Sequence, residues 1–225
     1  FIGLSKIFYH PQDVDVITIS SIHFDKSDQG EKSIYLNDNI PYDPLFDQLW
    51  LETEKLSYQG VNINLMVGGA GLAYGNLFDD FNIYYPMLQK LLNDKSWIKG
   101  IDLDIEEPVS LPNIKKLINQ IVQDFGTEFI ITMAPIAPSL INDGSSMAGF
   151  NYKELYQSKE GQYIHWFNTQ CYGSFSYETY DSIIKNGYPP EKIVMGMESG
   201  QFNSTTFKNA LHEIQKIKYA YPKMK

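Results

Sequence analysis

The stretch WIKGIDLDIEEP, residues 97–108, places an acid at every second position of an apolar run. The acids are Asp102, Asp104 and Glu106, and only leucine or isoleucine separates them. Because successive side chains of a β-strand point to opposite faces, the three carboxylates are expected to share one face of the strand. The apolar side chains would then occupy the other face and pack against helices.

Strand-like runs alternate with helical patterns along the chain. We expect strands at 15–24, 61–69, 98–106, 128–135, 164–172 and 192–197, with the tail of another at 1–5. Helices are expected between them at 44–60, 79–94, 113–126, 151–161, 177–187 and 204–221. Repeated strand–helix units predict an α/β fold with a parallel sheet, either open and doubly wound or closed into a barrel. The glycines at 68–75 lack the spacing of a dinucleotide-binding site.

The composition argues against several classes of protein. The 225 residues are 43% hydrophobic and 14% aromatic, which is ample for one packed core. A net charge of −9 makes nucleic acid and anionic membranes poor partners, and no apolar run is long enough to span a membrane. Cys171 is the single cysteine, so no internal disulfide can form. A glycosylation sequon at 203–205 mildly favours a secretory route, and a cytoplasmic location stays open.

The acidic strand suggests catalysis. Carboxylates crowded in a poorly hydrated interior cannot all stay charged cheaply, so at least one pKa is expected to rise, as a proton donor near neutral pH requires. Glu106 lies at the carboxyl end of the strand, where barrel enzymes form their active sites. A solvated strand face and a divalent-metal site are the alternatives. A metal would need further ligands on neighbouring strand ends, where only Asn168 offers itself, so we expect neither a metal nor a cofactor.

The segment 99–106 resembles the D-G-x-D-x-D-x-E signature of glycoside hydrolase family 18, the family of chitinases and endo-β-N-acetylglucosaminidases. Segments 64–69, 131–135, 166–172 and 192–197 resemble other strands of the family, in the same order. Two positions depart from the pattern: Lys99 replaces the first Asp of the signature, and Met66 stands where Ser is usual. The combination is most similar to the small fungal endo-β-N-acetylglucosaminidase-like branch.

The resemblance implies a TIM (β/α)8-type barrel and a single catalytic domain over 1–225. By this comparison the chain lacks the eighth strand, which usually brings a Trp, and most of the first. We therefore expect an excerpt of a longer protein, and an open, impaired barrel is the alternative. We expect the protein to be a monomer.

The resemblance also implies roles for four residues. Glu106 would protonate the glycosidic oxygen and later activate water. The substrate's own 2-acetamido group would be the nucleophile, with Asp104 bound to its N–H and Tyr172 to its oxygen. Asp102 would share a proton with Asp104 and tune its pKa.

Other residues are expected to contact the substrate. Alternation along 164–172 places Asn168 and Gln170 on the face of Tyr172, and a buried structural role is the alternative for Gln170. Two adjacent glycines would let the backbone approach the substrate or the neighbouring strand. Met133 either floors the site or fills the core, and Glu198 either binds substrate or is a solvated loop residue. The substrate-binding set is Gly68, Gly69, Met133, Asn168, Gln170 and Glu198.

The resemblance implies retaining hydrolysis of GlcNAc-β-1,4-GlcNAc bonds. The chitobiose core of N-glycans is favoured over chitin as substrate, on the branch resemblance alone. The alternative is an inactive carbohydrate-binding protein on the same barrel, a lectin. Such relatives typically lose the catalytic acid, whereas Glu106 is present here.

Overall fold

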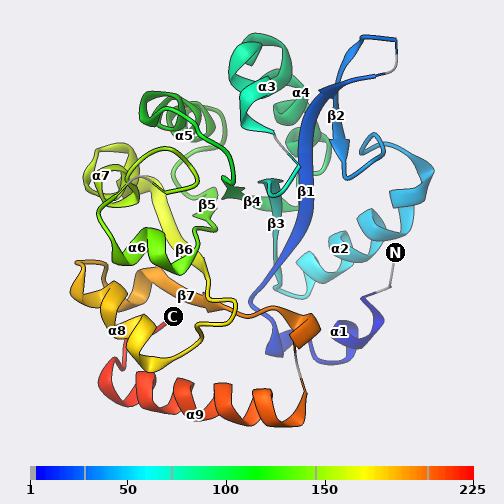
Figure 1. Cartoon of the computed structure of the whole chain (residues 1–225). Coiled ribbons are helices and arrows are strands. Elements are labelled where there is room, and N and C mark those ends of the chain that lie inside the picture. Colours follow the sequence, from blue (N-terminus) through cyan, green and yellow to red (C-terminus); the bar gives the residue numbers. More distant parts are fainter. Residues whose placement is uncertain (1–3, 28, 72, 145, 202) are drawn as a thin grey trace. The chain divides into compact units, whose positions relative to one another are not determined.

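The computed structural model describes residues 4–27, 29–71, 73–144, 146–201 and 203–225, and these hold seven strands that alternate with helices (Figure 1). The chain divides into two compact units, and each is described by itself. The first unit comprises Phe1–Val109 and Phe125–Ile130, and the second comprises Ser110–Asp124 and Ile131–Lys225. The single catalytic domain over 1–225 stays a prediction.

A four-stranded sheet forms the centre of the first unit. Its strands lie in the order β2 (Lys32–Leu36), β1 (Val16–Lys26), β3 (Asn62–Gly68) and β4 (Ile98–Asp104). β1 and β2 form an antiparallel hairpin, whereas β3 is parallel to both β1 and β4. The helices of this unit are α1 (Ser5–Tyr9), η1 (Pro11–Asp13), η2 (Pro44–Phe46), α2 (Asp47–Tyr58), α3 (Tyr74–Asp79) and α4 (Phe81–Asp94).

The alternation of apolar and acidic residues in the stretch 97–108 gives this sheet one apolar face and one acidic face. Ile101 and Leu103 of β4 are fully buried, and so are their register partners on β3, Leu65 and Val67. These four side chains form an apolar layer on one face. The acids of β4 lie on the opposite face, as the period-two pattern predicts.

The second unit contains three parallel strands and most of the remaining helices. The strands lie in the order β5 (Ile130–Met133), β6 (Ile164–Gln170) and β7 (Ile193–Gly196). The helices are α5 (Leu111–Phe125), α6 (Ala137–Ile141), α7 (Tyr152–Gln157), η3 (Glu160–Tyr163), α8 (Tyr177–Lys185), η4 (Pro190–Lys192), η5 (Ser199–Gln201) and α9 (Ser204–Ala220). Phe167 of β6 is fully buried, with Tyr152, Tyr156 and Tyr188 around its ring at centroid distances of 6.3, 6.1 and 5.5 Å.

The amino-terminal part of the chain contains a helix and a strand that were not expected, α1 and β2. The strand tail expected at 1–5 falls mostly on residues 1–3, which lie outside the described part of the chain, and α1 begins at Ser5. The strand expected at 15–24 is the first strand of the sheet and has 11 residues. An unexpected strand, β2, pairs antiparallel with β1. The expectation that most of the first barrel strand is missing stays a prediction.

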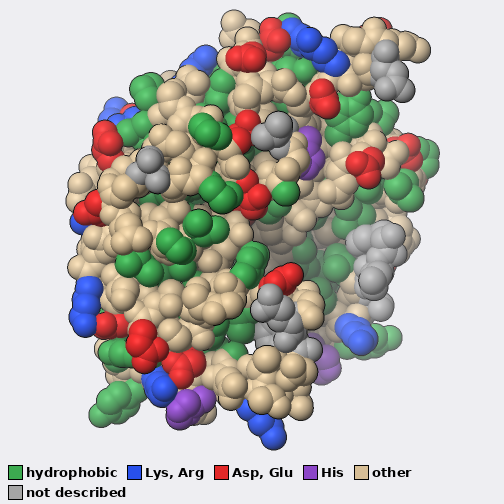
Figure 2. All heavy atoms as spheres, viewed as in Figure 1, with side chains coloured by type: hydrophobic (Ala, Val, Ile, Leu, Met, Phe, Trp, Pro, Cys, Tyr) green, Lys and Arg blue, Asp and Glu red, His purple; other side chains and the backbone are tan. Residues whose placement is uncertain are grey.

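The carboxyl ends of two strands also differ from expectation. β4 ends at Asp104 and β6 ends at Gln170, so Glu106 and Tyr172 each lie two residues beyond a strand, on a loop. No helix in the described ranges is both long and apolar enough to cross a membrane. On the face shown in Figure 2, acidic and basic side chains are interspersed with apolar ones.

Candidate active site

The acids of β4 occupy the polar face of the first unit. Asp102 is 3% exposed and Asp104 is 7% exposed, so both carboxyl groups are withdrawn from bulk water. In the parallel register, Asp102 is paired with Met66 and Asp104 with Gly68. Glu106 follows on the loop and is half-buried. A burial gradient therefore runs along the strand, from the enclosed Asp102 to the more accessible Glu106.

Two glycines at the carboxyl end of β3, the second just beyond the strand, make room for Asp104. Gly68 and Gly69 have φ angles of +99° and +84°, a backbone region that L side chains rarely adopt. A Cβ on Gly68 would lie 2.1 Å from the carbonyl oxygen of Asp104, and one on Gly69 would lie 3.6 Å from its Oδ2. The N–H of Gly69 donates to that same carbonyl oxygen at 2.9 Å. Of the two roles expected for these glycines, this geometry supports the close approach to the neighbouring strand.

Glu107 is a residue that the sequence analysis overlooked. Its carboxylate accepts hydrogen bonds from the backbone N–H groups of Ala73, Tyr74 and Gly75, at 2.5, 2.6 and 3.1 Å. The only signal in the sequence was a second acid next to Glu106. Its partners lie 32 to 34 residues earlier, around the start of α3, a helix that was not expected.

In the second unit, polar side chains follow one face of β6. The Trp166 indole N–H donates to Asn168 Oδ1 at 2.9 Å, and Asn168 Nδ2 donates to Thr132 Oγ1 at 3.4 Å. Gln170 Nε2 donates to the carbonyl oxygen of Ala134 at 2.7 Å. These contacts fix the orientation of both amides, and each amide residue keeps partial exposure.

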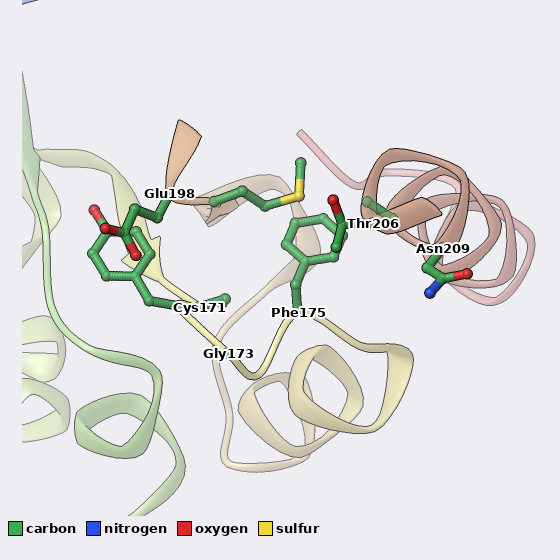
Figure 3. A pocket seen from close by; sticks show the side chains of 9 residues that line it. Cys171, Gly173, Phe175, Glu198, Thr206 and Asn209 are labelled. Carbon is green, nitrogen blue, oxygen red and sulfur yellow. The ribbon is translucent and has the colours of Figure 1, made fainter. Parts of the chain in front are cut away.

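Tyr172 and Glu198 meet in a cavity of about 330 Å³ at the carboxyl ends of β6 and β7. Tyr172 is 53% exposed, so its phenol is accessible. Figure 3 shows Phe175 across the cavity from Glu198, with Thr206 and Asn209 contributed by α9. The sequence predicted Tyr172 and Glu198 separately. It gave no signal for the side chains of α9, because the packing of a helix on a strand end is not a local property.

Two further residues of the second unit are explained by packing. Cys171 is buried, and burial raises the pKa of its thiol to about 12. It is therefore a neutral packing group and not a nucleophile at neutral pH. Met133 is fully buried and pairs in register with Phe167, whose ring lies among the tyrosines from helices and loops. This placement favours the core role for Met133 over contact with substrate.

The expected site residues thus fall into two groups, one in each unit. The first unit brings together Gly68, Gly69, Asp102 and Asp104, with Glu106 on the adjoining loop. The second unit brings together Asn168, Gln170, Tyr172 and Glu198 at or beyond strand ends. Both units have parallel strands with polar groups at the carboxyl ends. This arrangement is typical of barrel-type α/β enzymes and their non-catalytic relatives. No cluster of three or more His, Cys, Asp or Glu that could hold a metal occurs among the residues described.

Solved structures identify the family within that class. The chain is 32% identical to a fungal endo-β-N-acetylglucosaminidase from glycosyl hydrolase family 18, over 93% of this chain and 76% of that one, with a TM-score of 0.82. It is 28% identical to a chitinase from Aspergillus fumigatus, over 100% of this chain and 83% of that one, with a TM-score of 0.87. A family 18 chitinase from Pseudoalteromonas aurantia shares the fold at 19% identity and a TM-score of 0.69, over 92% of this chain and 83% of that one.

The chain belongs to glycoside hydrolase family 18. The family and the TIM-barrel-type α/β fold expected from the sequence are confirmed. No protein-family model matches the sequence, and no curated protein matches it.

Proposed function

We propose that the protein hydrolyses GlcNAc-β-1,4-GlcNAc bonds with retention of anomeric configuration, using the substrate's acetamido group as nucleophile. The observation that carries this proposal is the row of acids on and beyond β4. Two of them are almost completely buried, and the third is accessible on the loop. A pair of buried carboxyls beside an accessible one suits a proton donor that works next to a developing positive charge.

The first step of the proposed reaction breaks the glycosidic C–O bond. Glu106 gives its proton to the leaving oxygen while the acetamido oxygen bonds to the anomeric carbon, which forms an oxazolinium ion. Asp104 accepts the acetamido N–H and stabilises the positive charge, and Asp102 shares a proton with Asp104. Tyr172 donates its hydroxyl to the acetamido oxygen and holds it in line with the anomeric carbon.

The second step consumes water. Glu106, now a carboxylate, takes a proton from a water molecule that attacks the anomeric carbon, and the acetamido group is released. Two inversions at one carbon give net retention. Because the nucleophile comes from the substrate, the enzyme needs no second carboxylate in the position of a nucleophile.

The chitobiose core of N-glycans is our proposed substrate, ahead of chitin. Support comes from the 32% identity to a structure described as a fungal endo-β-N-acetylglucosaminidase, against 28% for the Aspergillus chitinase. A non-catalytic lectin is the second candidate, since the fold alone does not require catalysis. The presence of Glu106 favours the enzyme.

A comparison of Glu106→Gln with the wild type tests the proposed function. Both proteins are assayed on a high-mannose glycoprotein and on a chito-oligosaccharide. Loss of the proton donor should lower kcat by about 10²- to 10⁴-fold, the usual contribution of general acid–base catalysis. Glu128→Gln is the matched control. It makes the same chemical change at an exposed residue just before β5, at the amino end of a strand.

The two substrates separate the candidates. Release of glycan from the glycoprotein supports the endo-β-N-acetylglucosaminidase, and cleavage of the chito-oligosaccharide alone supports a chitinase. If wild type and Glu106→Gln are equally inert and both bind the oligosaccharide, the result contradicts the enzyme and supports the lectin.

A further inference from the structure

Glu107 connects the loop after β4 to the helix that follows β3. Its Oε1 accepts hydrogen bonds from the N–H groups of Ala73 and Tyr74, and its Oε2 accepts one from the N–H of Gly75. The first N–H groups of a helix have no partner within the helix, and the N-cap residue of α3, Ala73, has no side chain that could serve. A carboxylate from a distant part of the chain therefore caps α3. Charge-assisted hydrogen bonds of this kind are about twice as strong as neutral ones.

The capped helix is itself fixed to the sheet. Tyr74 is fully buried, and its hydroxyl donates to the carbonyl oxygen of Val67 on β3 at 2.8 Å. Asn76 Nδ2 donates to the carbonyl oxygen of Phe24 on β1 at 2.7 Å. The start of α3 thus has side-chain contacts to two strands, and Glu107 attaches the loop after β4 to this anchored structure.

Glu106 is the residue immediately before this attachment. On its other side, two residues away, the backbone carbonyl of Asp104 accepts a hydrogen bond from the N–H of Gly69, just beyond β3. The backbone that carries Glu106 is therefore held on both sides, although Glu106 itself lies beyond the end of the strand. Proton transfer requires the donor within about 2.6–3.2 Å of the acceptor oxygen. A displacement of about 1 Å can cost about 10²-fold in rate.

We propose that Glu107 is a positioning residue, whose hydrogen bonds to the start of α3 hold Glu106 at the distance from the glycosidic oxygen that proton transfer requires. The inference rests on the proposed function of Glu106 as the acid. Glu107 is not a second acid, because both of its oxygens already accept hydrogen bonds from backbone N–H groups.

Variants of Glu107 test the inference through the separation of kcat from KM. Glu107→Ala removes all three hydrogen bonds and should lower kcat by about 10²-fold, with KM changed by less than about threefold, since no contact with substrate is lost. Glu107→Gln keeps one carbonyl oxygen for Ala73 and Tyr74 and loses only the bond from Gly75, the longest of the three. It should retain kcat within about tenfold, so the conservative variant rescues most of the rate even if the alanine variant is poorly folded.

A double-mutant cycle with Glu106→Gln shows whether Glu107 acts through Glu106. If it does, Glu107→Ala has no further effect on kcat once the acid is gone. Equal losses in both backgrounds would mean that Glu107 acts independently of Glu106, and the inference would be overturned. Full activity of Glu107→Ala, in a protein that needs Glu106, would overturn it as well. If Glu106→Gln itself keeps full activity, the proposed function fails first, and the positioning role fails with it.

Discussion

At the scale of the single residue, the position of Asp104 depends on Gly68 of the neighbouring strand. The backbone of Gly68 lies so close to the Asp104 carbonyl that only hydrogen fits at its Cα. Its φ of +99° adds a conformational reason for glycine. Glycine is therefore required at position 68 for two reasons, the lack of space for a Cβ and the positive φ. Two glycine variants separate these reasons.

The variant Gly68→Ala should lose activity and stability together. Its Cβ would meet the Asp104 carbonyl oxygen at 2.1 Å and Tyr74 Cε2 at 2.7 Å, so β4 or α3 must move. We expect kcat/KM to fall by about 10²-fold or more, as a displacement of about 1 Å at a catalytic group can cause. Glycan-release kinetics and denaturant unfolding measure the two effects.

Gly60→Ala is the matched control for that variant. Gly60 has a similar φ, +91°, but an added Cβ would meet nothing within 4 Å. Gly60→Ala should lower the unfolding free energy by only about 1–2 kcal/mol, because an L residue is strained in the left-handed backbone region. It should leave kcat unchanged. Equal activity of the two variants would contradict the steric argument.

Residues whose roles follow from local alternation could be predicted from the sequence. Asp102 and Asp104 share the expected polar face because the pleat of a strand is a property of the strand alone. Glu107 and the side chains of α9 could not be predicted. Their contacts join segments more than 30 residues apart, and nothing in the local pattern shows which segments meet.

At the scale of the element, the longer helices were predicted, whereas some short elements, among them α3 and β2, were missed. α5 has 15 residues with a regular apolar face, so its period is visible in the sequence. α3 has six residues and contains a glycine, which is too short for a helical period. β2 did carry a signal. Ile34 and Leu36 are buried at alternate positions, and a turn with Gly30 separates them from β1.

The packing of α9 on α8 has a titratable contact. Just beyond α9, the Tyr221 hydroxyl donates to Asp181 Oδ1 at 2.5 Å, and Lys185 lies 2.6 Å from Asp181 Oδ2. The hydrogen bond from Lys185, followed by that from Tyr221, lowers the pKa of Asp181. The hydrogen bond to Asp181, together with burial, raises the pKa of Tyr221 to about 12. Both shifts mean that the native state prefers an ionised Asp181 and a neutral Tyr221.

This contact should make the stability of the second unit depend on pH in the acid range. Because the pKa of Asp181 is lower in the folded state, its contribution is present above the unfolded value of about 3.9 and is lost as pH falls through the folded value. The difference in thermal midpoint between wild type and Asp181→Asn should be constant from about pH 5 to 7. It should shrink below about pH 4. Thermal unfolding followed by circular dichroism from about pH 2.5 upward measures it.

Tyr221→Phe and Asp13→Asn complete that experiment. The phenylalanine variant removes the hydroxyl donor, so its effect should be smaller when Asp181 is already Asn. Asp13 is an exposed carboxylate near the amino terminus, and its replacement controls for the loss of one charge. A difference between wild type and Asp181→Asn that persists unchanged to the lowest pH would contradict the assignment of the shift.

At the scale of the whole molecule, the net charge of −9 bears on which sugars the protein attracts. Oligomers of N-acetylglucosamine are neutral, so long-range electrostatics should not steer them. Fully deacetylated glucosamine oligomers are cations at mildly acid pH and should be drawn to an acidic protein. They also lack the acetamido oxygen that the proposed reaction uses as its nucleophile.

Salt should therefore affect the deacetylated oligomer and leave the acetylated oligomer almost unaffected. For the acetylated oligomer, kcat/KM should change by less than about twofold between about 20 and 500 mM salt, because a neutral substrate gains nothing from the field. The deacetylated oligomer of equal length should inhibit at low salt and lose that inhibition as the Debye length shortens. It should never be cleaved, since water has no oxazolinium ion to attack. Cleavage of the deacetylated oligomer, detected by chromatography of the products, would leave Glu106 as an acid but remove the substrate's amide from the mechanism.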